Sequence, residues 1–409
     1  MSKPPLMSVA EARSRILALA EPVGEETASL LDAAGRVLAE DVEARRTQPP
    51  FAASAMDGYA VRAADARSGA TLRVVGEIAA GARADRPLAP GEAMRIFTGA
   101  PLPDGADAIL LQEDARREGD WVHVAPAKAD DAVSPGAWVR PAGGDFHEGE
   151  RLLRAPRRLS AEDVALAAAA GRSWLTVRRR PRIALLAVGD ELTLPGDPRG
   201  PADIVSSNNF GVAALLRAEG AEPVIFPLIR DDLDALGAAL EAARGFDALA
   251  TLGGASEGDL DLARPAFGAA QVGLDFYRIA MRPGKPLSAG RFPRGGPVAL
   301  GLPGNPVSAL VCARLFLAPL VDALLGLPAD GPPTSPRALA EAVDKNGPRE
   351  HYMRATREPD GRVRPVDDQD SSLLTRLSRA DALIVRPPFD PPRAAGEAVA
   401  CIMLRGSQV

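Results

Sequence analysis

Apolar and polar positions follow different periods along the chain and divide it into regions. Residues 8–20 carry apolar side chains at spacings of three and four behind a serine, which predicts an amphipathic helix. Further helices are predicted at 28–39 and 160–170. Between 45 and 149, short β-like runs alternate with Pro-x-Gly turns, which indicates a β-rich module inserted into an elongated helical domain.

A different pattern begins at residue 182, where apolar runs alternate with helical segments up to residue 326. This alternation predicts a parallel sheet covered by helices, and such sheets bind ligands at the carboxyl ends of their strands. A Gly/Pro-rich linker and short β runs follow. We therefore expect a multidomain α/β plus β fold: a helical domain (1–45 and 150–178), an inserted β-rich module (46–149), an α/β domain (179–328) and a β-barrel-like domain (329–409).

The composition excludes several classes of protein. A net charge of −6 argues against nucleic-acid binding, so any anionic ligand must meet local positive groups. Two cysteines without Cys-x-x-Cys spacing and three scattered histidines disfavour disulfide frameworks and zinc sites built on His or Cys. Charged residues interrupt the apolar positions of residues 1–22, so we expect neither a signal peptide nor a membrane span, and a cytoplasmic location.

A glycine-rich loop, GGASEGDLD at 253–261, follows the strand predicted to end at Leu252. Its glycines allow backbone N–H groups to converge on an anion, and Ser256 adds a hydroxyl donor. The alternative is a tight turn with Asp259 or Asp261 as a helix cap, and the loop alone does not decide between them. Its position at a strand end favours the phosphate cradle.

Three more elements are predicted at strand ends of the same domain. They are Glu191 after IALLAVG, Asp231 after PVIFPLI, and the GLPGNP segment at 301–306. Taken singly, these acidic residues are more often turn residues or helix caps. Gathered at one edge, carboxylates beside phosphate oxygens would suit Mg²⁺. The RPGKP turn at 282–286 adds rigid cations, although an exposed basic turn is the simpler interpretation of that segment.

Seven segments occur in one order along nearly the entire chain: SAMDGYA, RIFTGAPLPDGADAI, PAGGDFHEG, AVGDEL, GGASEGDLD, RPGKP and GLPGNPVSAL. Each is weak alone, but together they resemble the MoeA-type molybdopterin molybdenumtransferases, the family that includes the gephyrin E domain. The resemblance implies a MogA-like molybdopterin-binding α/β domain. It also implies a homodimer whose active cleft joins that domain to the β module of the partner subunit.

The reaction implied by the resemblance is insertion of molybdate into adenylylated molybdopterin, with release of AMP assisted by Mg²⁺ or Zn²⁺. The implied catalytic residues are Asp57, Thr98, Glu191, Asp231, Asp261 and Lys285, of which Glu191, Asp231 and Asp261 would bind the metal. The implied substrate-binding residues are Ser54, Gly253, Gly254, Ser256, Gly258, Arg278, Arg282, Pro303, Gly304, Asn305, Arg354 and Ser371. Molybdopterin adenylyltransferase and molybdoenzyme assembly factors are the implied partners.

Two departures from the family pattern concern charge. Glu257 adds negative charge to the glycine loop, and Arg278 and Arg282 stand where many members have lysine. Two alternatives stay open from the sequence. One is a pterin-binding scaffold without turnover, if Glu257 spoils the site; the other is a molybdopterin adenylyltransferase, because that related family shares the same α/β domain. The β module and the C-terminal domain argue against the adenylyltransferase.

Overall fold

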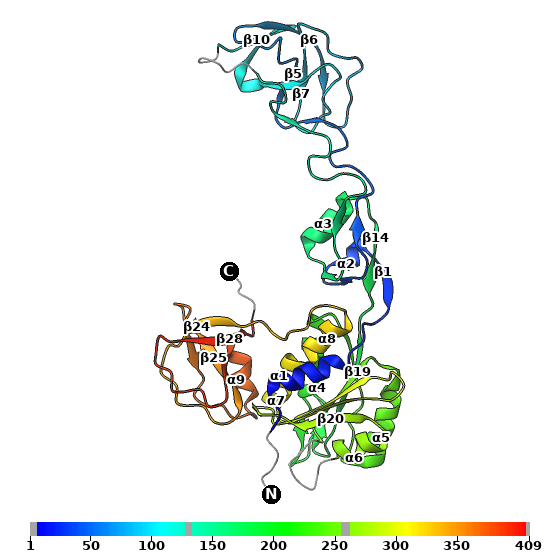
Figure 1. The fold of residues 1–409 in the computed structure, drawn as a ribbon, viewed down its shortest axis with the longest axis vertical. Helices are drawn as coiled ribbons and strands as arrows, with labels where there is room; N and C mark the ends of the chain where they lie inside the picture. The colour runs from blue at the N-terminus through cyan, green and yellow to red at the C-terminus, as the bar shows by residue number, and fades with distance from the viewer. Residues whose placement is uncertain (1–5, 127–132, 255–261, 406–409) are drawn as a thin grey trace. The chain divides into compact units, whose positions relative to one another are not determined.

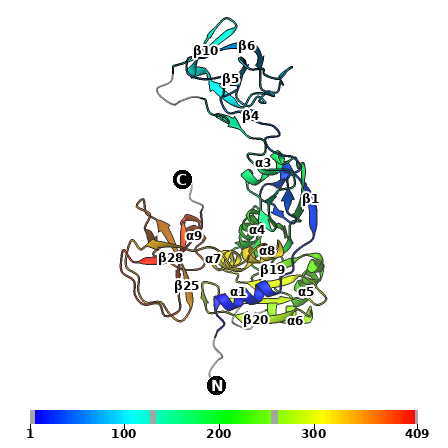
Figure 2. The same ribbon diagram turned by 45° about the horizontal axis from the view of Figure 1, so that its top comes forward.

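The computed structural model describes residues 6–126, 133–254 and 262–405 (Figure 1 and, turned by 45°, Figure 2). The chain forms two compact units. The first combines Met1–Glu26, Gly35–Val37 and Arg178–Val409, and the second combines Thr27–Ala34 and Leu38–Val177. The first unit therefore holds the predicted α/β and C-terminal regions, and the second holds the predicted β-rich module.

A six-stranded sheet forms the centre of the first unit. In sheet order its strands are β18 (Glu222–Ile225), β15 (Arg182–Ala187), β19 (Ala248–Leu252), β23 (Val298–Leu302), β22 (Pro286–Arg291) and β20 (Gly273–Arg278). The first four are parallel, whereas β22 and β20 pair antiparallel. The expected parallel sheet is thus a mixed sheet, because the short connections around β22 permit antiparallel pairing, while parallel pairing requires a crossover.

Helices cover both faces of this sheet (Figure 1). One face packs on α5 (Leu233–Ala242) and α6 (Ala263–Ala269). The other packs on α4 (Asn208–Ala218), α7 (Pro306–Cys312), the π-helical turn η3 (Ala313–Leu317), α8 (Ala318–Leu324) and α1 (Val9–Ala18). Because both faces are covered, every residue of β19 and β23 is buried, which explains their continuous apolar sequence.

The segment Pro306–Leu324, formed by α7, η3 and α8, is long and apolar enough to cross a membrane by length and composition. However, 78% of its most apolar window is buried inside the protein. A helix that is apolar on all sides is expected in the core of a large domain. The segment packs accordingly, with Val307, Phe316 and Leu320 in the main core.

The predicted helical first domain is not confirmed. Besides α1, its segments contain only the single turn α2 (Leu30–Ala33) and α3 (Ala161–Ala169). They also form a four-stranded sheet of β1 (Glu25–Ser29), β14 (Trp174–Arg178), β2 (Val37–Leu38) and β13 (Arg157–Arg158), with β3 (Val42–Glu43) pairing β12 (Arg151–Leu153). The helix predicted at 28–39 is wrong, because Gly35, at φ +76°, lies just after α2 in a conformation that ends helices.

The helices at 8–20 and 160–170 are confirmed, the first with its predicted serine cap and the second with a serine cap that was not predicted. Ser8 Oγ accepts a hydrogen bond from the Glu11 N–H at 3.1 Å, and Ser160 forms a capping box with Asp163. The apolar face of α1, however, packs in the core of the α/β region through Val9, Ala12 and Ile16. Periodicity therefore predicted the helix correctly but did not identify what it packs against.

The β-rich module of the second unit contains a six-stranded sheet. In sheet order its strands are β8 (Ala108–Leu111), β5 (Gly58–Val61), β7 (Glu92–Ile96), β6 (Thr71–Ile78), β10 (Trp121–Val124) and β9 (Ala115–Glu118), and β4 (Ala53–Ser54) pairs β11 (Val139–Arg140) separately. Gly58 is required at the centre, because a Cβ there would lie 2.1 Å from the Leu110 carbonyl oxygen.

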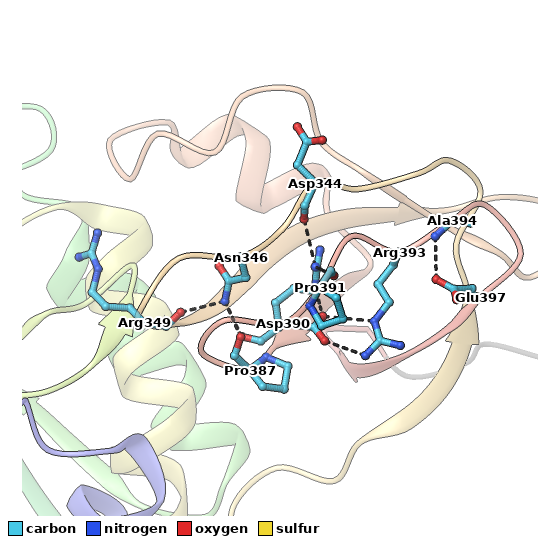
Figure 3. A network of polar contacts seen from close by, with 10 residues as sticks. Asp344, Asn346, Arg349, Pro387, Asp390, Pro391, Arg393, Ala394 and Glu397 are labelled. Carbon is cyan, nitrogen blue, oxygen red and sulfur yellow. Dashed lines mark hydrogen bonds and ion pairs between the residues drawn. The ribbon is translucent and has the colours of Figure 1, made fainter.

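The C-terminal region of the first unit is a sheet of β21 (Met281–Arg282), β25 (Glu350–Arg357), β27 (Ala382–Arg386), β28 (Ala398–Met403) and β24 (Ser335–Ala338), with β26 (Val363–Pro365) on β25. A polar network joins two of its loops (Figure 3). The Asp390 carboxylate accepts hydrogen bonds from Arg386 and Arg393, and Asn346 Nδ2 donates to the carbonyls of Arg349, Arg386 and Pro387. These charge-assisted bonds hold the loops on the sheet edge.

Candidate active site

A cavity of about 650 Å³ opens at the carboxyl ends of β15, β19 and β23. The loops that follow these three strands and the N-terminus of α4 form its walls. Its lining includes the predicted site residues Glu191, Asp231, Gly253, Gly254, Pro303, Gly304 and Asn305. The structure therefore brings together side chains and turns that lie up to about a hundred residues apart in sequence, as expected for parallel strands.

The start of the glycine loop requires glycine. Gly253 has φ +97°, and a Cβ on it would lie 2.5 Å from the Val188 carbonyl oxygen. Gly254 has φ +68° and lines the cavity beside it. Ser256, Gly258 and Asp261, which the sequence assigned to the rest of this loop, lie outside the described residues, as does Glu257.

Two carboxylates line the cavity. Asp231 and Asp190 exchange hydrogen bonds: each backbone N–H donates to the other's carboxylate, at 3.3 and 3.2 Å. The Glu191 carboxylate accepts no hydrogen bond from the described part of the chain and lies close to Gly189, where a Cβ would meet it. The next residue, Asp232, caps α5 through the Ala235 N–H at 2.8 Å. Of the two adjacent aspartates, Asp231 therefore lines the cavity and Asp232 caps the helix.

The N-termini of two helices, α4 and α7, also face the cavity. Ser206, Ser207 and Asn208 line it at the start of α4, and Asn305 and Pro306 line it at the start of α7. Asn208 Nδ2 donates to the Gly304 carbonyl at 2.6 Å and so joins the two turns. Free backbone N–H groups and the helix dipole make such ends favourable for anions. The start of α4 can offer such groups, whereas at α7 Pro306 has no N–H and the Val307 N–H already donates to the Ser371 carbonyl at 3.0 Å.

Sequence reasoning missed the SSNN segment at 206–209. Its signal was available, because a run of serine and asparagine immediately before a helical pattern is typical of an N-terminal cap. Ser371, which was predicted, lies near the cavity: its Oγ accepts a hydrogen bond from Asn305 Nδ2 at 2.9 Å. Its neighbour Ser372 lines the cavity directly.

The predicted cations do not converge on this cavity. Arg282 instead lines a separate hollow of about 430 Å³ in the C-terminal region, beside His351, whose pKa falls to about 4 through burial and the nearby arginines. Arg354 is 1% exposed, and its guanidinium donates to Gln369 and to the carbonyls of Asp368 and Asp370. Its placement does not support direct anion binding, because its donors already hold the loop that leads to Ser371.

Arg278 and Lys285 do not line the cavity either, although Pro286, next to Lys285, does. Arg278 ends β20, where it is opposite Pro286, and Lys285 immediately precedes β22. Of the RPGKP segment, only Pro286 lines the cavity.

In the second unit the predicted residues Ser54, Asp57 and Thr98 form one cluster. Asp57 Oδ1 accepts hydrogen bonds from both the backbone N–H and the hydroxyl of Thr98, each at 2.8 Å. These bonds, together with the charge of Arg95, lower the pKa of Asp57. Ser54 is buried and donates to the Met56 carbonyl at 2.6 Å, which shapes the turn that presents Asp57.

Comparison with known proteins accounts for this arrangement. Three family models match consecutive parts of the chain: the MoeA N-terminal region (domain I and II) at residues 7–171, the probable molybdopterin binding domain at 184–323, and the MoeA C-terminal region (domain IV) at 337–404. The molybdopterin molybdenumtransferase of Nostoc sp. is 34% identical over 93% of this chain and 88% of its own length. The chain belongs to the molybdopterin molybdenumtransferase family.

Other members of the family are similar to this chain over most of its length and support the same assignment. The molybdopterin molybdenumtransferase 2 of Mycobacterium tuberculosis is 36% identical over 90% of this chain and 93% of its own. The crystal structure of the molybdopterin biosynthesis moeA protein from Pyrococcus horikoshii OT3 superposes with a TM-score of 0.84 at 26% identity, over 98% of this chain and 100% of that one. The chain is therefore an enzyme of molybdenum cofactor biosynthesis with the multidomain fold of this family.

Proposed function

We propose that this enzyme inserts molybdate into adenylylated molybdopterin at the 650 Å³ cavity and releases AMP. The observation that supports this assignment is the meeting of two carboxylates, a glycine turn and two helix N-termini around one cavity in a member of this family. A substrate with a phosphoanhydride carries several negative charges. Helix N-termini can bind such oxygens without a basic overall protein.

Mg²⁺ fits the donor set of the cavity. Glu191 and Asp231 provide oxygen ligands, and Mg²⁺ commonly uses one or two carboxylates together with substrate phosphates and water. No histidine or cysteine lines the cavity in the described residues, so Zn²⁺, which prefers nitrogen and sulfur ligands, fits less well. No group of three or more His, Cys, Asp or Glu suited to a metal occurs in the described ranges; Asp261, the third expected ligand, lies outside them.

The residues of the cavity have separate roles in binding the substrate and the metal. The N-terminal N–H groups of α4 bind and orient the anionic oxygens, and Glu191 and Asp231 would hold the metal beside them. When bound, Mg²⁺ offsets the charge that develops on the phosphate leaving group. Asp57, fixed in direction by Thr98, contributes a negative charge from the partner subunit's β module.

A homodimer agrees with an exposed apolar region of the second unit. Leu31 is 96% exposed and Trp174 is 62% exposed. They lie on neighbouring segments, because the Leu30 N–H donates to the Ser173 carbonyl at 3.3 Å. Large apolar side chains that are this exposed are typical of interaction surfaces, and a second copy of the chain is the partner we propose. We further propose that the enzyme works in the cytoplasm, where the adenylyltransferase and molybdoenzyme assembly factors would be its partners.

The central test is a turnover assay. Purified protein with adenylylated molybdopterin, molybdate and Mg²⁺ should release AMP, and omission of the divalent ion should stop release. Binding of the pterin with no AMP release at any metal concentration would favour the scaffold. Consumption of ATP with unadenylylated molybdopterin would favour the adenylyltransferase.

The shared cleft has its own test. Asp57→Ala and Asp231→Asn subunits are each expected to be inactive as homodimers. A mixed dimer places both changes in one cleft and leaves the other intact, so it should recover about half of the wild-type sites. No recovery in isolated heterodimers would show that each cleft is built from one subunit.

A further inference from the structure

A second hollow, of about 310 Å³, lies in the first unit away from the substrate cavity. Its walls come from α4, α7, α9 (Leu374–Arg379), β27 and the chain after β28. They are mainly aliphatic: Leu215, Leu310, Val311, Leu377, Leu383 and Leu404. It shares no lining residue with the 650 Å³ cavity, although α4 and α7 contribute to both. A mostly apolar hollow with few polar groups is typical of a small-molecule site.

The polar groups of this hollow include two arginines in different states. The Arg405 guanidinium donates to the Ser378 carbonyl. The Arg314 guanidinium makes no hydrogen bond or ion pair within the described residues. The negative charge of Glu219 acts on it and favours its charged form. Burial lowers the pKa of Arg314, yet an arginine stays charged at neutral pH. The Arg314 side chain is only half-buried, and its donors that meet no protein group are available to a ligand.

Arg314 also lies at an unusual place in the backbone. It belongs to the π-helical turn η3, between α7 and α8. Such turns insert into α-helices mainly at functional sites. The same side chain borders a neighbouring hollow of about 340 Å³, where the buried hydroxyl of Ser335 also has no partner among the described residues. An unused hydroxyl donor thus lies on that side of Arg314, together with the acidic residues Glu219 and Asp322.

We infer that this hollow binds a small amphipathic carboxylate, with its apolar body against the leucines and its carboxylate on Arg314. The guanidinium fork matches a carboxylate with two parallel hydrogen bonds. A phosphate dianion fits less well, because Arg405, the second arginine of the walls, already donates to the Ser378 carbonyl. At ~30 Å³ for each water-sized group, 310 Å³ corresponds to roughly ten non-hydrogen atoms. Octanoate has this size and is the probe of choice.

The first experiment compares three compounds with the wild-type full chain by calorimetry or ligand-observed NMR. Octanoate should bind with one site per chain. 1-Octanol, with the same chain and no charge, and acetate, with the charge and no chain, should each bind at least about tenfold more weakly. Octanol binding as tightly as octanoate would overturn the role of Arg314, and no octanoate binding would overturn the site.

Variants locate the site. Arg314→Met should weaken octanoate binding roughly ten- to a hundredfold, the loss expected for a charge-assisted hydrogen-bonded pair. Arg405→Met is the matched control, because its guanidinium is already bonded to Ser378, and it should change binding less than about threefold. Equal losses in the two variants would overturn the assignment.

A third variant leaves Arg314 in place. Leu215→Trp should fill the hollow and abolish octanoate binding, with folding checked by the thermal unfolding midpoint of the free protein. Octanoate binding that survives in a folded Leu215→Trp protein would place the ligand elsewhere. All these experiments measure the binding of octanoate. Their outcome therefore does not depend on whether the protein releases AMP at the other cavity.

Discussion

Asp57 in the second unit and the pair Glu191 and Asp231 in the first unit are acidic residues beside strand ends, yet their carboxylates are bonded differently. Asp57 accepts two hydrogen bonds on one oxygen from Thr98, which fixes its direction and lowers its pKa. Asp231 accepts one bond from a backbone N–H, and Glu191 accepts none among the described residues. A carboxylate that is already bonded acts as a fixed charge, whereas one with open lone pairs can bind a metal.

The largest expected effect on AMP release comes from removing the carboxylates of Glu191 and Asp231, which have lone pairs available for a metal. Glu191→Gln combined with Asp231→Asn should lower the rate of AMP release by about a hundred- to a thousandfold, because the charge that holds Mg²⁺ is lost. Asp232→Asn is the matched control: it is adjacent but caps α5, and asparagine caps a helix as well as aspartate does. If both proteins turn over normally, the carboxylates do not take part in the reaction.

The second prediction concerns the glycine turn between them. Gly253→Ala should lower the free energy of unfolding by about 1–3 kcal/mol, because a side chain at φ +97° is strained and would contact the Val188 carbonyl. Gly237→Ala, in the interior of α5 with open space around it, should instead raise it by about 0.5–1 kcal/mol. Chemical denaturation of both variants measures the difference, and equal effects would show that the turn tolerates a side chain.

The smallest expected effect concerns Asp57, the carboxylate that already accepts hydrogen bonds from Thr98. Thr98→Val removes the hydroxyl donor to Asp57 and keeps the backbone donor, so the pKa of Asp57 should rise toward its ordinary value near 3.8. AMP release near neutral pH should change less than about tenfold, because Asp57 stays ionised there. Titration of Asp57 by NMR measures the shift, and an unchanged pKa would mean that the backbone bond alone sets it.

The lowered pKa of Asp57 also determines how this residue's contribution to folding stability depends on pH. The pKa of Asp57 is lower in the folded than in the unfolded chain, so its contribution to stability is present above pH 3.8 and is lost as the pH falls toward the folded value. Acid unfolding of the second unit should therefore begin at a higher pH in Thr98→Val than in the wild type. An identical acid profile would assign the loss of stability to other carboxylates.

Part of the site could be predicted from sequence because of a property of parallel sheets. Motifs that follow successive parallel strands meet at one edge, so the order of Glu191, Asp231, Gly253 and Gly304 after apolar runs was sufficient to bring them together. The cations were less predictable. Arg282 lies in the short strand β21 and Arg354 in the antiparallel strand β25. The direction of such a long side chain depends on its neighbours, for example the loop carbonyls that hold Arg354.

The sequence by itself determined the family, the alternation of strand and helix in the α/β region, the capped helices and the glycines that their turns require, because these depend on local periodicity and backbone sterics. Tertiary structure decided that α1 packs on the α/β core, that the central sheet is mixed, and that Arg314 lies beside a second hollow without a hydrogen-bond partner among the described residues. These features depend on contacts between residues far apart in the chain. Such contacts leave no period in the sequence, because packing accepts many combinations of apolar residues of similar volume.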